Sequence, residues 1–463
     1  MKKISKSFLW GASTSAYQFE GGYNSDGKGP SIQDEKEIIN KETSDFKIAS
    51  DHYNHWKEDV ALMREMGFKS YRFSISWTRI IPNGIGKVNQ KGIEFYSNLI
   101  NELLKNKIEP IVTMFHFDMP NELEKIGGWA NRKVINAYVN YANILFDNFG
   151  DRIKYWITIN EQNVLLLQGP IVGIKRPENC NVLQHVFQMN HNITVAQALV
   201  MQECHKRFTN KVKIGTAPNI SSIYPASCKP EDVIASKNIG VLKNWFYLDI
   251  IVKGYYNRIL LALLEEQNAM FEIKAGDMEI IQKANPDFIA FNYYTTTTVK
   301  MNEKIANYKL PIQERIFGFP GFGETVSNKN LNKTQFGWEI DPKGLKVTLL
   351  ELQERYNLPV IITENGIGAY DKLENEKIID DYRIAYLKSH IEAIKEAVNE
   401  GSQIFGYNCW SAFDLVSVHE GISKRYGLIY IDRDEKNIKE AKRIRKKSSY
   451  WYEQLIRSNG EKL

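Results

Sequence analysis

The chain has 463 residues, of which 43% are hydrophobic and 25% are charged, a composition typical of a soluble protein with a large core. No stretch approaches the ~18 consecutive apolar residues that a membrane-spanning helix needs, so we expect no membrane segment. Lys and Arg exceed Asp and Glu by only five, 60 against 55, which gives no reason to expect a nucleic-acid partner.

The first residues, Met-Lys-Lys-Ile-Ser-Lys, have the basic opening of a secretion signal. The apolar run that follows is only Phe8-Leu9-Trp10, whereas a signal peptide needs a hydrophobic core of roughly 7–15 residues. We therefore expect a retained N-terminus and a cytoplasmic protein. The four cysteines show no Cys-x-x-Cys spacing, so we expect neither a disulfide framework nor a zinc or other metal site.

Short apolar, β-rich runs alternate with longer segments in which apolar residues recur every three or four positions. The short runs predict strands at 8–13, 70–73, 110–115, 155–159, 212–217, 288–292, 359–363 and 404–409. The longer segments predict helices at 52–66, 92–104, 133–149, 183–208, 345–355, 381–398 and 439–455. The last begins in the most basic stretch of the chain, which we interpret as the solvated face of an amphipathic terminal helix.

Eight strand signals separated by helices predict an α/β protein with a parallel sheet. Because no linker rich in Pro, Gly or Ser divides the chain, we expect residues 1–463 to form one (β/α)8 TIM barrel with extended βα-loops. A doubly wound sheet is the alternative. Residues 234–265 show further helical pattern, and 303–340 read as a long loop insertion of the kind that covers barrel active sites.

Polar side chains follow seven of the eight predicted strands, where a barrel enzyme places its chemistry. In chain order they are Tyr17, Gln18 and Glu20; Arg72; His116; Asn160 and Glu161; Asn292, Tyr293 and Tyr294; Glu364 and Asn365; and Trp410 and Ser411. Each alone would be an ordinary loop charge, salt-bridged side chain or core residue. Together they predict one polar rim with two carboxylates, many neutral hydrogen-bonding groups and an aromatic platform, which suits the binding of a sugar.

Two Glu residues on different strands suit glycoside hydrolysis, in which one acts as a protonated acid and the other as an ionised nucleophile. An ionised carboxylate needs a cation or donors nearby, which Arg72 and Tyr294 could supply. A separation of roughly 5–5.5 Å between the two carboxyl groups goes with retention of configuration, and roughly 6.5–9.5 Å with inversion. The sequence leaves that separation open.

These residues resemble the motifs of glycoside hydrolase family 1. The matching stretches, which extend over nearly the whole chain, are 8–21, 71–84, 158–161 (Thr-Ile-Asn-Glu), 291–294 (Phe-Asn-Tyr-Tyr), 337–342, 362–366 (Ile-Thr-Glu-Asn-Gly) and 410–411. The resemblance implies a retaining β-glycosidase on an eight-stranded barrel, without a cofactor.

The resemblance also implies a role for each matching residue. Glu364 would attack the anomeric carbon, and Glu161 would protonate the leaving oxygen and then activate water. The remaining predicted substrate-binding residues are Arg72 and Tyr294 (orienting Glu364), Asn160 (the sugar 2-hydroxyl), Gln18 and His116 (glycone hydroxyls), Trp410 (beneath the ring) and Asn292. Gln162 and Phe117 stand where many members have Pro and Trp, and both resemble the branch that acts on phosphorylated sugars.

The loop after the eighth predicted strand carries the substrate prediction. Members that cleave unphosphorylated glucosides resemble Glu-Trp where this chain has Ser417-Val418, and a carboxylate there would repel a 6-phosphate. The spacing of Ser417, Lys424 and Tyr426 resembles the phosphate site of 6-phospho-β-glycosidases, with donors that suit a dianion. Without the resemblance, Lys424-Arg425-Tyr426 would be interpreted as a solvated turn. Arg425 stays ambiguous, because members without phosphate specificity also carry Lys-Arg there.

Val418 favours 6-phosphoglucosides, because the galactoside branch resembles Ser-Trp at this point and valine cannot donate a hydrogen bond. His419 fits neither pattern. We therefore predict hydrolysis of 6-phospho-β-D-glucosides, such as cellobiose 6-phosphate or aryl β-glucoside 6-phosphates. The alternatives are a 6-phospho-β-galactosidase, an unphosphorylated β-glucosidase and a non-catalytic sugar-phosphate sensor. The aglycone and the choice between monomer and homo-oligomer stay open.

Overall fold

The computed structural model describes residues 4–36, 42–175, 177–178, 180–302, 323–418 and 420–463. Eight parallel strands close into a barrel in chain order, and the last pairs with the first. They are β1 (Leu9–Ser13), β2 (Ser70–Ser74), β3 (Glu109–Phe115), β4 (Tyr155–Asn160), β5 (Lys213–Ala217), β7 (Phe288–Asn292), β10 (Val360–Glu364) and β11 (Ile404–Trp410). The predicted TIM barrel is confirmed, and each predicted strand lies within two residues of an observed one.

The strands are buried along nearly their whole length because both faces of a closed barrel are covered. Ile111, Ile157, Ala217, Ala290 and Ile361 come from five different strands and form a buried cluster of their own, which fills the barrel interior. The outer faces pack against the main core beneath the surrounding helices.

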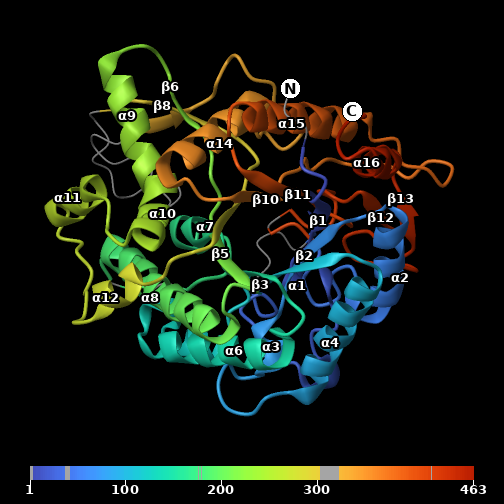
Figure 1. Cartoon of the computed structure of the whole chain (residues 1–463), viewed down its shortest axis with the longest axis horizontal. Helices are drawn as coiled ribbons and strands as arrows, with labels where there is room; N and C mark the ends of the chain where they lie inside the picture. Colours follow the sequence, from blue (N-terminus) through green and yellow to red (C-terminus); the bar gives the residue numbers. More distant parts are fainter. Residues whose placement is uncertain (1–3, 37–41, 176, 179, 303–322, 419) are drawn as a thin grey trace.

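Helices surround the strands (Figure 1). The longer ones are α2 (His52–Glu65), α4 (Gln90–Lys105), α6 (Lys133–Phe149), α8 (Val182–Phe208), α9 (Pro230–Gly240), α14 (Pro342–Tyr356), α15 (Asp381–Asn399) and α16 (Lys447–Arg457). The shorter ones are α1 (Ala16–Phe19), α3 (Trp77–Ile80), α5 (Asn121–Lys125), α7 (Gln162–Leu167), α10 (Phe246–Leu248), α11 (Arg258–Glu266) and α12 (Asp277–Gln282). None of the described helices is long and apolar enough to cross a membrane.

The helical pattern predicted at 234–265 is confirmed as a run of α9, α10 and α11. Two π-helical turns, η3 (Val241–Trp245) and η4 (Asp249–Lys253), interrupt this run. Of the loop predicted at 303–340, residues 303–322 lie outside the described part of the chain. The rest contains β9 (Glu324–Val326), which forms a small sheet with β6 (Ile223–Pro225) and β8 (Thr297–Lys300).

The C-terminal helix begins later than predicted. Instead of a helix over 439–455, α16 starts at Lys447, and the preceding β13 (Arg443–Arg445) pairs antiparallel with β12 (Ile429–Ile431). The Arg443 Nε donates to Asp59 Oδ1 at 2.8 Å, and the Lys446 Nζ donates to Asp414 Oδ1 at 2.6 Å, with all four side chains buried. These two basic residues bind buried carboxylates, so the prediction of a solvated basic face was wrong for them.

Candidate active site

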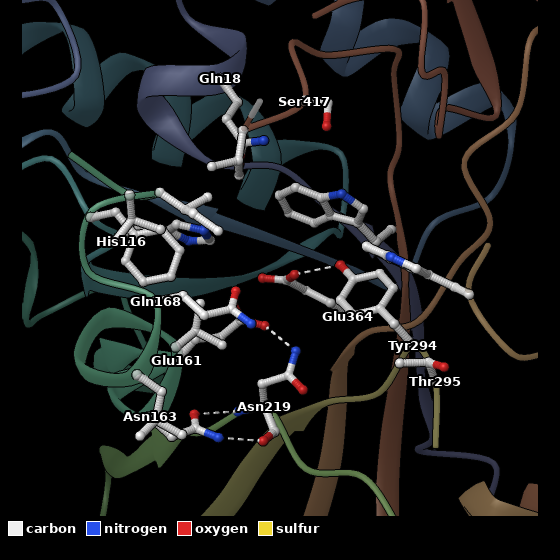
Figure 2. Close-up of a pocket in the computed structure, with 18 of the residues that line it drawn as sticks. Gln18, His116, Glu161, Asn163, Gln168, Asn219, Tyr294, Thr295, Glu364 and Ser417 are labelled. Carbon is white, nitrogen blue, oxygen red and sulfur yellow. Dashed lines mark hydrogen bonds between the residues drawn. The ribbon is translucent and has the colours of Figure 1, made fainter. Parts of the chain in front are cut away.

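A cavity of about 370 Å³ opens at the carboxyl ends of the barrel strands and brings most of the predicted site residues together. Figure 2 shows Gln18 and Ser417 at one end, Asn163 and Asn219 at the other, and the two glutamates between them. The predicted residues that line the cavity are Gln18, His116, Glu161, Tyr294, Glu364, Trp410, Ser417 and Tyr426. Arg72, Asn160, Asn292 and Lys424 do not line it but contact residues of the site.

Glu364 is the last residue of β10, and both of its carboxylate oxygens accept hydrogen bonds. Arg72 Nη1 donates to Oε1 at 2.5 Å. The Tyr294 hydroxyl donates to Oε2 at 2.6 Å, as Figure 2 shows. Burial raises the pKa of Glu364 above its ordinary value, and the Arg72 charge and the Tyr294 hydrogen bond oppose that rise. The guanidinium therefore favours the ionised form that a nucleophile needs.

The glycine of the Glu364-Asn365-Gly366 motif has a steric reason. A Cβ atom on Gly366 would lie 1.8 Å from the backbone oxygen of Trp410, so no other residue fits where the backbone turns away from β10. The Asn365 Nδ2 donates to the Tyr293 carbonyl at 2.8 Å. The motif thus fixes the backbone that follows Glu364.

Glu161 follows β4 and has the left-handed backbone conformation, with φ +44°. Conformations of this kind persist in non-glycine residues where the surroundings hold them, and they cluster at functional sites. Here the Glu161 backbone N–H donates to the Ala217 carbonyl at 2.6 Å. The conformation directs the side chain into the cavity, where its Oε1 accepts from Asn219 Nδ2 at 2.8 Å and Asn292 Nδ2 at 3.0 Å.

Burial raises the pKa of Glu161 to about 7, and the negative charge of Glu364 adds to the rise. The amide donors of Asn292 and Asn219 oppose it. The negative charge on Glu364 favours the protonated form of Glu161, so the arrangement suits Glu161 as a proton donor and Glu364 as an ionised nucleophile. The two environments separate the roles of two chemically identical groups.

Asn219 is a site residue that the sequence pattern did not single out. It follows β5, the one strand for which no polar residue was chosen, and its side chain hydrogen-bonds to Glu161. Asn163 fixes it from both sides, because Asn163 Oδ1 accepts from the Asn219 backbone N–H at 3.0 Å and Asn163 Nδ2 donates to the Asn219 carbonyl at 2.6 Å. A search of the residues just after β5 would have found it.

Asn160 connects the two halves of the site. Its Oδ1 accepts from Arg72 Nη2 at 2.6 Å and from Asn292 Nδ2 at 3.1 Å, and its Nδ2 lies 3.1 Å from His116 Nε2. Burial and the Arg72 charge hold the pKa of His116 well below its ordinary value, so the imidazole is neutral. Its Nε2 then accepts from Asn160.

Two aromatic rings and Gln18 form another part of the cavity lining. The His116 and Trp410 rings stack at a centroid separation of 6.1 Å and an interplanar angle of 17°. The Gln18 Nε2 donates to the Val416 carbonyl at 2.8 Å, which joins the loop after β1 to the loop after β11. Phe117, one of the two residues that depart from many family members, also lines the cavity.

The second departure, Gln162, is the buried first residue of α7. Its Nε2 donates to Asn190 Oδ1 at 2.8 Å and its Oε1 accepts from Gln197 Nε2 at 2.6 Å. Both partners belong to α8, so this amide connects the start of α7 to α8. It does not belong to the described cavity lining.

In the loop after β11, Ser417, Val418 and Tyr426 line the cavity, and Lys424 is buried next to them. The Lys424 Nζ lies 5.7 Å from the centre of the Tyr426 ring and donates to Glu420 Oε2 at 2.6 Å. His419, whose role the sequence left open, lies outside the described residues.

Arg425 is bound away from this cavity. It forms an ion pair with Asp414 at 2.9 Å and donates to the carbonyls of Ile431 and Arg433. The ambiguity that the sequence left at Arg425 therefore resolves to a structural role.

The remaining lining of the cavity mixes apolar and polar side chains. The apolar residues are Val164, Leu167, Ile171 and Val172, and the polar ones are Asn163, Gln168, Asn219, Lys243 and Thr295. Burial lowers the pKa of Lys243 to about 8, and its Nζ donates to Thr297 Oγ1 at 2.7 Å. Across the described ranges, no group of three or more His, Cys, Asp or Glu side chains is arranged to hold a metal ion.

Comparison with known proteins gives matches over nearly the full length of the chain. The sequence model of Glycosyl hydrolase family 1 matches residues 1–461. The chain is 41% identical to Aryl-phospho-beta-D-glucosidase BglC of Bacillus subtilis and 38% identical to a 6-phospho-beta-glucosidase of Clostridium longisporum, with 99% of this chain and 98% of each relative covered. A family 1 β-glucosidase structure from Thermotoga maritima superposes with a TM-score of 0.89 at 37% identity, over 99% of both chains.

Proposed function

The chain belongs to glycosyl hydrolase family 1, and from that premise we propose that it hydrolyses 6-phospho-β-D-glucosides to glucose 6-phosphate and an aglycone. Cellobiose 6-phosphate and aryl β-glucoside 6-phosphates are the substrates we have in mind. The printed names of the Bacillus subtilis and Clostridium longisporum relatives support a phosphorylated substrate.

The observation that carries the proposal is the composition of one wall of the cavity. Ser417 and Tyr426 offer hydroxyl donors to the same cavity that holds Glu161 and Glu364, and the buried Lys424 ammonium lies beside them. Hydroxyl and ammonium donors suit a phosphate, whose charge near neutral pH is about −1.5 to −2. A carboxylate in place of Ser417 would repel that group.

In the first step of the proposed reaction, a Glu364 oxygen attacks the anomeric carbon as the glycosidic C–O bond breaks. Glu161 gives its proton to the leaving oxygen, so that the aglycone departs as a neutral alcohol or phenol. Arg72 and Tyr294 hold the attacking carboxylate in place through hydrogen bonds to its two oxygens. The product of this step is a glycosyl ester of Glu364.

In the second step, the ionised Glu161 takes a proton from a water molecule, whose oxygen attacks the anomeric carbon. The ester bond to Glu364 breaks, Glu364 leaves as a carboxylate, and Glu161 is protonated again. Two inversions at one carbon give net retention.

The other predicted residues would position the sugar. Asn160 is held by Arg72 and Asn292 close to both carboxylates, which suits a hydrogen bond to the 2-hydroxyl. Gln18 and His116 would bind the remaining glycone hydroxyls, and the Trp410 ring would lie beneath the sugar.

Kinetics on matched chromogenic substrates test the proposal. We expect kcat/KM for p-nitrophenyl β-glucoside 6-phosphate to exceed that for the unphosphorylated glucoside by 100-fold or more, about 2.7 kcal/mol. The galactoside pair is measured alongside. A preference for the galactoside phosphate would mean that Val418 does not select glucose, and equal turnover without phosphate would favour a β-glucosidase. No turnover of any of the four substrates would favour the sensor.

We further propose that the enzyme is one domain over residues 1–463 and acts in the cytoplasm. A sugar that is phosphorylated during uptake carries a dianionic group that does not cross a lipid bilayer unaided, so it stays in the cytoplasm, where the enzyme would meet it. Fractionation of cells that express the native chain tests this. Light scattering decides between the monomer and the homo-oligomer.

A further inference from the structure

A carboxylate already occupies the position between two of the proposed phosphate donors. Glu420 Oε2 lies 2.6 Å from Lys424 Nζ and accepts a hydrogen bond from Ser417 Oγ at 3.4 Å. An anionic oxygen within reach of both groups stands where an oxygen of the substrate phosphate would have to lie.

The surroundings of Lys424 explain why an anion is needed there. Its side chain is 1% exposed, and its ammonium lies 4.0 Å from the Trp338 ring centre and 4.4 Å from that of Phe336. Aromatic faces attract a cation but do not neutralise it. Burial lowers the pKa of Lys424, and Glu420 opposes this effect. A buried ammonium requires a counter-charge whether or not a substrate is present.

The Glu420 side chain is partly exposed to solvent, whereas hydrogen bonds hold the backbone around it. The Ile422 and Ser423 backbone N–H groups donate to the Glu435 carboxylate at 3.0 and 2.7 Å, and the Ser417 N–H donates to the Gly421 carbonyl at 2.9 Å. By contrast, the Glu420 side chain is 29% exposed. Rotation of that side chain toward solvent would leave Ser417 and Lys424 in place.

We infer that Glu420 is an internal competitor for the 6-phosphate. It neutralises Lys424 in the empty site, yields that position to the dianionic phosphate of the substrate, and returns to it as glucose 6-phosphate leaves. This inference rests on the proposed function and adds a residue that sets how tightly the phosphate is held. A neutral 6-hydroxyl offers Lys424 no counter-charge, so an unphosphorylated glucoside leaves the Glu420–Lys424 pair intact.

The test is Glu420→Gln, which keeps the size of the side chain and removes its charge. We expect the inhibition constants of glucose 6-phosphate and inorganic phosphate to fall about tenfold, with a lower KM for p-nitrophenyl β-glucoside 6-phosphate. Turnover of the unphosphorylated glucoside should stay within twofold. Glu440→Gln is the matched control, because Glu440 is exposed and pairs with Lys442 on the surface.

Unchanged or higher inhibition constants in a folded Glu420→Gln protein would overturn the inference and make Glu420 a support for Lys424. In Glu420→Gln/Lys424→Met, the effect of Glu420→Gln should vanish, and its persistence would also count against the inference. If Glu420→Gln fails to fold, Glu420→Asp shortens the reach of the carboxylate and should lower the constants in the same direction. If the wild type prefers phosphorylated glucosides but the Glu420 variants show none of these effects, this inference alone is refuted. If the wild type lacks that preference, the proposed function is refuted as well.

Discussion

The alkaline limit of activity should move upward when Asn219 is replaced by alanine. Burial raises the pKa of Glu161 from its usual 4.5 to about 7, which corresponds to about 3 kcal/mol against the ionised form. Asn219 opposes that rise by donating to Glu161 Oε1 at 2.8 Å. A hydrogen bond to a charged group contributes roughly 1.5–3 kcal/mol, so its loss should raise the pKa of Glu161 by about one pH unit or more.

The sign follows from the acid role. Glu161 must be protonated for the first step, so kcat/KM is full below its pKa and falls as pH rises through about 7. In Asn219→Ala the fall should come at higher pH. The assay is the pH dependence of kcat/KM with cellobiose 6-phosphate above about pH 6.5, because the phosphate itself titrates near 6. Its leaving group is a sugar alcohol, so cleavage depends on proton donation.

Two further variants sharpen this test. Asn219→Asp adds a negative charge beside Glu161 and should move the limit further upward, whereas Asn101→Ala on the outer face of α4 should leave it unchanged. An alkaline limit that stays in place, or moves to lower pH, would refute the assignment of Glu161 as the acid whose ionised form Asn219 stabilises.

Three other changes have defined expectations. Lys424→Ala should lower kcat/KM for phosphorylated glucosides by about 2 kcal/mol, roughly thirtyfold, and leave the unphosphorylated glucoside within twofold; an equal loss for both would place Lys424 outside the phosphate site. Tyr294→Phe removes the donor to Glu364 Oε2 and should lower kcat/KM tenfold or more, and wild-type kinetics would dismiss that contact. Glu161→Gln should raise Tm more at pH 8 than at pH 5. The pKa of Glu161 is about 7 in the folded state against an ordinary value of 4.5, so ionisation of Glu161 destabilises the wild-type fold increasingly as pH rises between these two values. A Tm difference between variant and wild type that does not change with pH would contradict the raised pKa.

Local patterns in the sequence were enough to predict the barrel and most of the rim. Strands buried on both faces produce short, mainly apolar runs in the sequence, and the surrounding helices produce apolar residues with a period of 3.6. Both signals are therefore contained in a few neighbouring residues. In a parallel barrel the strand ends share one face, and for that reason Glu161 and Glu364 could be brought together although 203 positions separate them in the chain.

Contacts between distant segments decided the remainder. The sequence pattern around 439–455 favours a helix, yet Arg443 and Lys446 bind Asp59 and Asp414, which are remote in the chain, and the helix starts only at Lys447. The position of Asn219 just after β5 marks it as a rim residue, but its partner is visible only in the structure, where it donates a 2.8 Å hydrogen bond to a residue 58 positions earlier.

The loop after β11 shows the same division within ten residues. The residue types and spacing in this loop, compared with the family, indicated that Ser417, Lys424 and Tyr426 could hold a phosphate. Only the tertiary structure showed that Glu420 reaches Lys424 and that the Phe336 and Trp338 rings enclose the ammonium. Residue types and spacing therefore determined which groups the site contains. Their charge states and partners depend on burial and on distances through space, which no stretch of sequence states by itself.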